Sequence, residues 1–248
     1  MHRFHISDFS KSEVILNKEE SRHALAVLRV KTGEVVELLD GKGGVFQGIV
    51  SGTDRGAVKV SVMAKREEAP NPVALTLAAS VIKPEAMEFL IQKACELGVH
   101  AVVPVISERT VVRLSRERWE AKAERWRKIA RESCKQCGQS RMPAIQPVTT
   151  FKDLLNALPE HDLALIPTLA GQVAGLYPTL KAHTFARSIL LFIGPEGDFS
   201  PGEVSQALEK RVRPVSLGPL VLRSETAALY ALSVLGFFYR EAVLEGKK

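Results

Sequence analysis

Two glycine-led segments near the C-terminus hold the residues whose types and spacing best suit chemistry. One reads Gly194-Pro-Glu-Gly-Asp-Phe-Ser-Pro-Gly-Glu203 and follows an apolar run over Ser188–Ile193. The other reads Gly218-Pro-Leu-Val-Leu-Arg-Ser-Glu-Thr-Ala227 and follows a second run over residues 214–217. Because glycine lets the backbone approach a ligand closely, both segments could bind a ligand through main-chain groups. Two well-capped turns without a ligand would show the same pattern.

The local pattern also predicts a helix directly after the first segment. Ser200 can cap this helix, Pro201 suits its first position, and Glu203 completes a Ser-x-x-Glu capping box. Neither segment has the spacing G-x-G-x-x-G or G-x-x-x-x-G-K-[ST], so ordinary dinucleotide and nucleoside triphosphate sites are disfavoured.

The elements that must position these segments belong to a region of alternating strands and helices. Residues 73–248 contain β-branched and leucine-rich runs separated by helix-period segments, which predicts a mainly parallel α/β sheet. A helix over residues 85–97, ending at Gly98, would cover it. We expect the two glycine-led segments to follow adjacent strands and to meet at one edge of the sheet. The strands are expected at residues 73–80, 99–106, 163–167, 188–193 and 214–217.

The first 70 residues have a different pattern. Short apolar runs alternate with glycine, as in β-hairpins, and one short helix is expected over residues 19–28. We interpret residues 1–70 as a small β-barrel-like domain, ending near the charged, proline-bearing linker of residues 65–72.

Positive charge is concentrated in one segment. The chain carries 34 Lys and Arg against 28 Asp and Glu, a net charge of +6. Residues 109–141 alone contain eleven Lys and Arg against four Glu, so the rest of the chain is close to neutral. A localised basic face is typical of a polyanion-binding protein. Arg127, Arg131 and Lys135 lie four residues apart on one helix face, which could equally be a solvated face.

Composition excludes several other classes. Hydrophobic residues make up 46% and charged residues 25%, as in globular proteins. The uncharged apolar stretch of residues 226–239 is shorter than the roughly 20 residues that cross a bilayer, so we expect a buried helix and no membrane span. No secretory signal follows Met1, which together with three cysteines predicts a cytoplasmic protein. Cys134 and Cys137 lack a second pair, so packing is favoured over a metal site. Trp119 and Trp126 are expected in the core.

Several phrases, taken together in this order, resemble one known family. They are Ile193-Gly-Pro-Glu-Gly-Asp-Phe-Ser200 and Leu217-Gly-Pro-Leu-Val-Leu-Arg-Ser-Glu-Thr-Ala227, with His23-Ala-Leu-Ala-Val-Leu-Arg29, Gln92-Lys-Ala-Cys-Glu-Leu-Gly98, Pro104-Val-Ile-Ser-Glu-Arg109 and Gln136-Cys-Gly138. The chain is similar over nearly its whole length to the RsmE family, ribosomal RNA small subunit methyltransferase E, of the SPOUT superfamily.

The resemblance implies both fold and activity. It implies a PUA-like β-barrel RNA-binding domain over residues 1–70 and a SPOUT α/β-knot methyltransferase domain over residues 73–248, with a deep C-terminal trefoil knot, in a homodimer. It implies methyl transfer from S-adenosylmethionine to N3 of a uridine in the decoding region of 16S rRNA, within the small ribosomal subunit, with S-adenosylhomocysteine as product and no metal. A SPOUT ribose 2′-O-methyltransferase acting on rRNA or tRNA and a non-catalytic rRNA-binding assembly factor are the alternatives.

The resemblance places the cofactor residues, whereas the catalytic roles are a hypothesis from the chemistry of N3 methylation and the RNA contacts are a hypothesis from charge. Arg223 would stabilise charge on the uracil oxygens, and Glu196 or Glu225 would accept the proton, unless these glutamates only satisfy loop amides or cap helices. The cofactor would be bound by Thr168, Leu169, Ile193, Gly194, Pro195, Glu196, Gly197, Ser216, Leu217, Gly218, Leu220, Val221 and Leu222. RNA would contact Arg3, Arg22, His23, Arg29, Arg109, Arg113, Arg131, Lys135 and Arg141, with His23 alternatively a packed barrel residue.

The chain departs from the family pattern at three places. Asp198 stands where the family usually has a second glycine, which brings a carboxylate to the edge of the expected pocket. Lys135-Gln-Cys-Gly-Gln139 replaces the frequent Glu-Gln-x-Gly-Arg, and Ser224 replaces the commoner threonine after Arg223.

Overall fold

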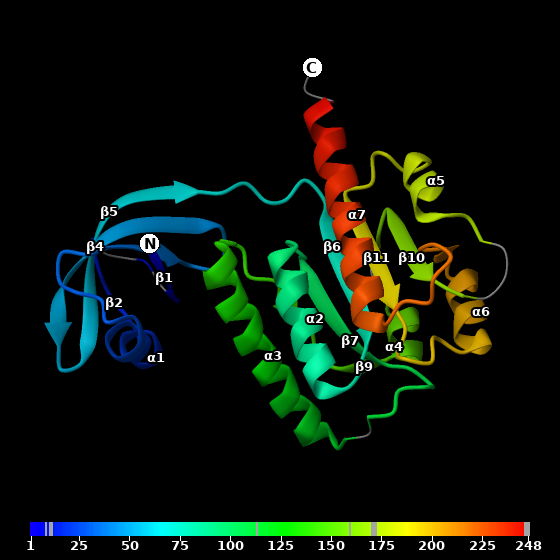
Figure 1. The fold of residues 1–248 in the computed structure, drawn as a ribbon, viewed down its shortest axis with the longest axis horizontal. Coiled ribbons are helices and arrows are strands. Elements are labelled where there is room, and N and C mark those ends of the chain that lie inside the picture. Colours follow the sequence, from blue (N-terminus) through cyan, green and yellow to red (C-terminus); the bar gives the residue numbers. More distant parts are fainter. Residues whose placement is uncertain (8, 10–11, 113, 159, 170–172, 246–248) are drawn as a thin grey trace. The chain divides into compact units, whose positions relative to one another are not determined.

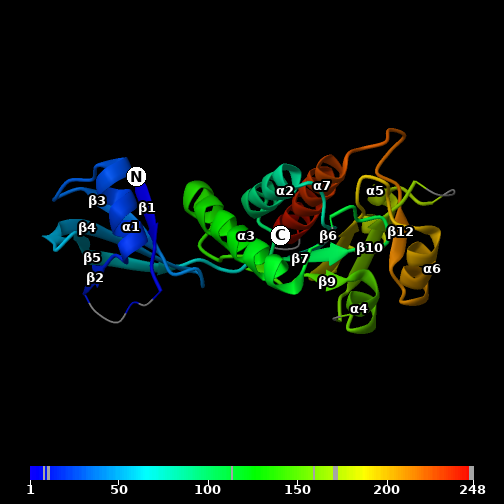
Figure 2. The ribbon, with the colours of Figure 1, turned by 90° about the horizontal axis from the view of Figure 1, so that it is seen from below.

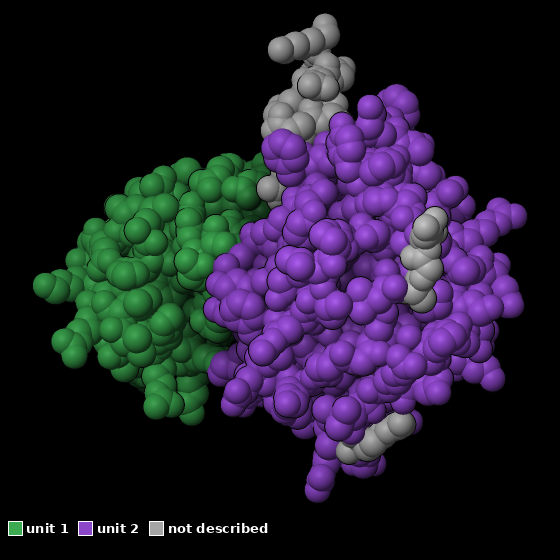
Figure 3. All heavy atoms as spheres, turned by 45° about the vertical axis from the view of Figure 1, so that its right-hand side comes forward, with its two compact units in different colours: residues 1–70, 131–142 green, residues 71–130, 143–248 purple. Residues whose placement is uncertain are grey.

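The structure is a computed structural model (Figure 1). It describes residues 1–7, 9, 12–112, 114–158, 160–169 and 173–245, and for residues 240–245 it describes the backbone alone. The chain divides into two compact units, coloured separately in Figure 3. Unit 1 comprises Met1–Pro70 and Arg131–Met142, and unit 2 comprises Asn71–Ala130 and Pro143–Lys248. Unit 1 therefore contains a segment, Arg131–Met142, in addition to the residues that we assigned to the first domain.

Unit 1 is built on a five-stranded sheet in the order β1-β3-β4-β5-β2. Its strands are β1 (His2–His5), β2 (Glu13–Ile15), β3 (Val35–Leu39), β4 (Gly44–Asp54) and β5 (Ala57–Glu67). β3, β4 and β5 form the expected antiparallel hairpins, and β1 joins β3 in parallel. Arg55 and Gly56 form the turn between β4 and β5. Their φ values are 48° and 83°, and a two-residue type I′ hairpin turn requires positive φ at both positions. Alternate strand residues are buried around Phe4 and Phe46.

The expected helix over residues 19–28 is two elements. α1 (Lys18–Arg22) begins at Asn17, whose side chain accepts the backbone N–H of Glu20 at 2.9 Å. A π-helix, η1 (His23–Leu28), follows directly and ends at Arg29 in the left-handed conformation. The spacing of apolar residues over so short a segment cannot distinguish an α-helix from a π-helix, because Ala24 would be buried in either.

Unit 2 contains a seven-stranded sheet in which every described pairing is parallel. The strands are β6 (Ala74–Ser80), β7 (Ala101–Ile106), β8 (Ala144–Ile145), β9 (Thr149–Thr150), β10 (Leu163–Pro167), β11 (Ser188–Ile193) and β12 (Arg213–Val215). This confirms the predicted parallel α/β sheet. The order is β12-β10-β11-β6-β7-β8, with β9 also paired to β7. The expectation that β11 and β12 are adjacent is wrong, because β10 pairs with both and lies between them.

Helices cover both faces of this sheet. They are α2 (Pro84–Glu96), α3 (Arg116–Cys137), α4 (Phe151–Asn156), α5 (Leu176–Lys181), α6 (Pro201–Glu209) and α7 (Ser224–Glu245), and α3 continues into unit 1 from Arg131. α2 and α7 pack together on one face, and α4 lies on the other, where it contacts α6 (Figure 2). Phe151, Phe192 and Phe199 form the centre of the second face.

The long apolar stretch of residues 226–239 lies within α7. Ala228, Leu232 and Leu235 are buried, as expected, whereas Tyr230 and Phe237 are exposed. None of the helices in the described residues has the length and apolarity needed to cross a bilayer. Trp119 and Trp126 are buried on one face of α3, which confirms the prediction that they belong to the core.

Candidate active site

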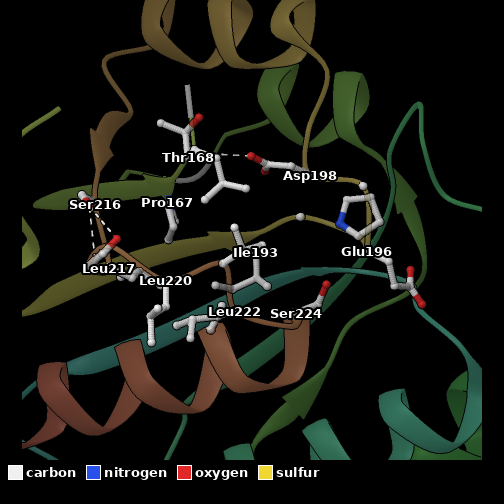
Figure 4. A pocket seen from close by; sticks show the side chains of 17 residues that line it. Pro167, Thr168, Ile193, Glu196, Asp198, Ser216, Leu217, Leu220, Leu222 and Ser224 are labelled. Carbon is white, nitrogen blue, oxygen red and sulfur yellow. Dashed lines mark hydrogen bonds between the residues drawn. The ribbon is translucent and has the colours of Figure 1, made fainter. Parts of the chain in front are cut away.

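Three loops at the carboxyl ends of β10, β11 and β12 surround a cavity of about 250 Å³ (Figure 4). All thirteen residues that the sequence analysis assigned to a cofactor line it. Pro167, Asp198, Ser224 and Ala227 line it as well. Asp198 was expected at the edge of the pocket, whereas Pro167, Ser224 and Ala227 were not assigned to it, although each lies within or beside the same loops. In an open parallel sheet this edge is where ligands bind.

The loop after β11 is held by the start of α6. Ser200 Oγ accepts the N–H of Glu203 at 3.2 Å, and Glu203 Oε2 accepts the N–H of Ser200 at 2.9 Å, which confirms the predicted capping box. Pro201 occupies the first turn, where its missing N–H costs nothing. The position of the pocket wall at Gly197 is therefore fixed from the helix side.

Asp198 ties this loop to the loop after β10. Its backbone has a φ of 61°, a left-handed conformation that glycine adopts freely and that aspartate tolerates better than most residues. Its carboxylate accepts the N–H of Phe199 at 2.7 Å and the N–H of Leu169 at 3.3 Å. A β-carbon on Gly194 would lie 3.0 Å from this carboxylate and from the nitrogen of Phe199, so a larger residue there would push these atoms apart.

The loop after β12 turns at Gly218. Gly218 has a φ of 118°, and its N–H donates to Ser216 Oγ at 3.2 Å. The backbone of Ser216 bonds to Ala174 and Leu176, which fixes the start of the loop. Leu220 and Val221 beyond the turn are 74% and 77% exposed, so an occupant of the pocket would cover apolar surface that is now open.

The pocket is lined by both apolar and polar side chains. Figure 4 shows Ile193, Leu220 and Leu222 gathered on one side, with Thr168 and Asp198 on the other. The residues of the 218–223 loop belong to no helix or strand, so their backbone groups are not committed to a regular hydrogen-bond ladder. Such a surface suits a ligand that combines a flat apolar part with groups that hydrogen-bond to main chain.

The three predicted catalytic residues differ in their relation to the pocket. Glu196 lines it, and Figure 4 shows its carboxylate directed away from Ile193 and Leu222. Arg223 is exposed between the lining residues Leu222 and Ser224, and its carbonyl accepts the N–H of Ala227 in the first turn of α7. Glu225 is half-buried in that turn, where a carboxylate also stabilises the helix dipole.

Among the predicted RNA contacts, two arginines of unit 1 are exposed. Arg22 ends α1, and Arg29 follows η1 in the left-handed conformation. His23 lies between them and is half-buried, with its ring edge-on to Phe4 at 6.5 Å between centroids. Arg22 and Arg29 are therefore available to phosphate groups, and His23 contributes at least in part to packing.

Lys135 differs from this expectation. Its side chain is 7% exposed, and its ammonium donates to both carboxylate oxygens of Glu20 at 3.0 and 3.1 Å and pairs with Glu132 at 2.8 Å. A buried ammonium engaged in this way has no free face for a phosphate, so the structure argues against direct RNA contact by Lys135.

Arg3, Arg109 and Arg141 also make internal bonds. Arg3 donates to Glu37 at 2.8 Å and to the carbonyls of Lys135 and Gln136 at the end of α3. Arg141 donates to the carbonyls of Lys42 and Glu68, and Arg109 donates to the carbonyl of Gly197. Arg131 is half-buried, and Arg113 lies outside the described residues. The basic segment thus stabilises unit 1 and the pocket as well as carrying exposed charge.

One carboxylate and one imidazole of unit 1, those of Glu37 and His5, have lowered pKa values. Burial opposes ionisation of Glu37, but hydrogen bonds from Arg3 and Arg66 outweigh it and lower its pKa. Burial, assisted by the positive charges of Arg131 and Lys135, lowers the pKa of His5. Within the residues that the structure describes, no group of three or more His, Cys, Asp or Glu side chains could hold a metal ion.

Comparison with known proteins agrees with this architecture. A family model described as an RNA methyltransferase domain matches residues 69–236, and one described as an RNA methyltransferase PUA domain matches residues 16–63. The ribosomal RNA small subunit methyltransferase E of Synechocystis is 32% identical over 90% of this chain and 72% of its own length.

Two solved structures share the fold over nearly the whole chain. The ribosomal RNA small subunit methyltransferase E of Neisseria gonorrhoeae, bound to S-adenosylmethionine, is 29% identical over 96% of this chain and 98% of its own, with a TM-score of 0.88. A methyltransferase of Legionella pneumophila, also with bound S-adenosylmethionine, is 30% identical over 94% and 96%, with a TM-score of 0.87.

Proposed function

The chain belongs to the ribosomal RNA small subunit methyltransferase E family, and on that premise we propose that its pocket binds S-adenosylmethionine for methylation of N3 of a uridine in the decoding region of 16S rRNA. S-adenosylhomocysteine is then the second product. The observation that carries the proposal is the convergence of three loops, with all thirteen predicted cofactor residues, on one cavity.

The residues present fit the cofactor. Ile193, Leu217 and Leu222 offer apolar walls to an adenine ring, and the backbone of residues 219–222, which lies outside any helix or strand, offers donors and acceptors to its edge. Gly194 and Gly218 allow the main chain to come close to the ligand. When bound, the cofactor supplies a methyl group on a positively charged sulfur.

Methylation of N3 requires this chain to manage one proton and one developing charge. We place Glu196 at the pocket as the proton acceptor, with Glu225 as the alternative, and Arg223 at the rim as the group that stabilises negative charge on the uracil oxygens. Base pairing hides N3, so the protein must take an unpaired or extruded uridine, at a cost of a few kcal/mol where unstacking is needed. Holding the base in line with the methyl group then supplies much of the rate.

RNA reaches the pocket, in this proposal, through exposed basic residues. Arg22 and Arg29 in the PUA-like unit and exposed arginines of α3 contact phosphates. With about four phosphates neutralised, the logarithm of affinity should fall against the logarithm of salt concentration with a slope of roughly −3 to −4. A flat salt response would contradict this part of the proposal.

The decisive experiment maps the methyl group. Purified protein is incubated with S-adenosylmethionine and small ribosomal subunits or 16S rRNA from a strain that lacks it, and the digested RNA is analysed by mass spectrometry. We expect one methyl group on the uracil base. A methyl group on ribose would support the 2′-O-methyltransferase alternative, and absence of S-adenosylmethionine binding in calorimetry would support the assembly factor.

The catalytic roles are tested separately from binding. Arg223→Ala should lower turnover at saturating cofactor while leaving cofactor affinity near its original value, because Arg223 does not line the cavity. Glu196→Gln and Glu225→Gln are compared in single turnovers, and the variant with the larger loss identifies the proton acceptor. Unchanged turnover of Arg223→Ala would remove that residue from the chemistry.

We also propose that the protein is a cytoplasmic homodimer with a knotted C-terminal region, as the family resemblance implies. Tyr230 and Phe237 lie seven residues apart on α7, and Phe89 on the neighbouring α2 is also exposed. Phe237 is 70% exposed, so this apolar surface suits a second copy. Phe237→Asp should shift the sedimentation coefficient from dimer to monomer, whereas a monomeric starting protein would refute the proposal.

A further inference from the structure

We propose that Arg109 is a positioning residue that holds one wall of the pocket, rather than a phosphate contact. The inference rests on the proposed function of that pocket as the cofactor site. Arg109 lies in the turn after β7, formed by residues 107–110, and Gly197 lies in the loop after β11. β6 separates the two strands in the sheet, so the contact is between loops that are distant in sequence.

The 107–110 turn is closed by hydrogen bonds between the buried residues at its two ends. The N–H of Ser107 donates to Thr110 Oγ1 at 2.9 Å, and the N–H of Thr110 donates to the carbonyl of Ser107 at 3.1 Å. The hydroxyl of Ser80, at the end of β6, donates to that of Ser107 at 3.2 Å. All three side chains are almost completely buried. The backbone on which Arg109 stands is therefore preorganised.

The same turn is attached to the start of α6. Glu203 Oε1 accepts the N–H of Glu108 at 2.8 Å, while its Oε2 accepts the N–H of Ser200 in the capping box. One buried carboxylate therefore joins the residue before Arg109 to the helix that follows Gly197. This link brings the backbone before Arg109 close to the start of α6, but neither of its bonds reaches Gly197 itself.

The side chain of Arg109 completes this connection. Its Nη1 donates to the carbonyl of Gly197 at 2.6 Å, a bond strengthened by the positive charge of the donor. A β-carbon on Gly197 would lie 3.5 Å from Cδ of Arg109, so the aliphatic part of the arginine lies against the glycine. Because Gly197 lines the cavity, Arg109 sets the position of its wall.

The test measures S-adenosylmethionine binding without RNA. Arg109→Ala should weaken binding about five- to tenfold, the effect of losing one charge-assisted hydrogen bond. Arg109→Lys, which keeps a charged donor, should restore part of the affinity. Arg213→Ala is the matched control, because Arg213 is exposed at the start of β12, lies outside the basic segment, and its loss changes the net charge equally. It should bind like the unaltered protein.

Kinetics and RNA binding provide the second readout. In Arg109→Ala the KM for S-adenosylmethionine should rise while kcat at saturating cofactor stays within about twofold, a separation that general unfolding would not produce. The salt slope of RNA affinity should not change. Unchanged cofactor affinity together with a slope reduced by about one would overturn the inference and make Arg109 a phosphate contact. If the unaltered protein bound no S-adenosylmethionine, the proposed function itself would fail, and this inference with it.

Discussion

Substitution of Asp198 should change stability and cofactor affinity in different ways. Its left-handed backbone costs a residue with a β-carbon about 1 kcal/mol relative to glycine. Its carboxylate accepts two backbone N–H groups, from Phe199 and Leu169, and each bond contributes about 1 kcal/mol. Asp198→Gly loses the bonds but relieves the backbone, whereas Asp198→Ala loses the bonds and keeps the strain. We expect Asp198→Ala to be less stable than Asp198→Gly by about 1 kcal/mol.

Affinity for S-adenosylmethionine should instead fall by the same factor in both variants. Both lose the bond to Leu169 that holds two pocket loops together, and about 1 kcal/mol corresponds to roughly fivefold in the dissociation constant. Asp198→Asn keeps one acceptor oxygen and tolerates the left-handed backbone, so it should lie between them and the unaltered protein.

Urea unfolding measures the stability difference, and calorimetric titration measures the affinities. Equal stability of Asp198→Ala and Asp198→Gly would mean that the loop does not impose the left-handed conformation. Unaltered affinity in both variants would mean that the bridge to Leu169 does not shape the pocket. Either result would refute the corresponding step of the reasoning.

Two further predictions concern unit 1. Lys135→Ala should lower the free energy of unfolding, measured in urea, by about 3 kcal/mol, because it leaves the carboxylate of Glu20 buried without its partner. The salt slope of RNA affinity should stay unchanged. A variant that keeps its stability but has a reduced slope would show that Lys135 is a phosphate contact. The lowered pKa of His5 means that, as pH falls through 6.5, the unfolded chain takes up a proton that the folded chain resists, so urea unfolding should become easier between pH 7.5 and 5.5. His5→Asn should reduce that pH dependence; a pH dependence that is the same in His5→Asn as in the unaltered protein would exclude His5 as its source.

Local signals in the sequence predicted two of the three pocket loops, whereas the third loop, with Thr168 and Leu169, was assigned from the family resemblance. The apolar run before Gly194, the Ser200–Glu203 capping box and the glycine at 218 each specify a strand end, a helix start or a turn within ten residues. Parallel strands then bring their carboxyl ends to one edge by construction, and the loops converge. The helix start was correct in detail for the same reason.

The features that the sequence could not predict depend on distant contacts. The order of parallel strands is decided by crossover connections, so nothing near β11 or β12 indicated that β10 separates them. The row of charges ending at Lys135 showed a basic helix face, but helical spacing contains no information on what covers that face, and Glu20 is more than a hundred residues away. Arg109 was assigned to RNA by its charge alone, whereas its hydrogen bond to Gly197 depends on the tertiary fold.

Unit 1 consists of two segments that are separate in the sequence, which limits where the chain can be cut into stable fragments. Because Arg131–Met142 supplies the ammonium that pairs with Glu20 and two carbonyls that accept from Arg3, a fragment that ends at Pro70 would leave the buried Glu20 carboxylate without its partner and Arg3 without two of its acceptors. Limited proteolysis in the Ser140–Met142 region should therefore loosen the amino-terminal third of the chain even though no peptide bond within it is broken.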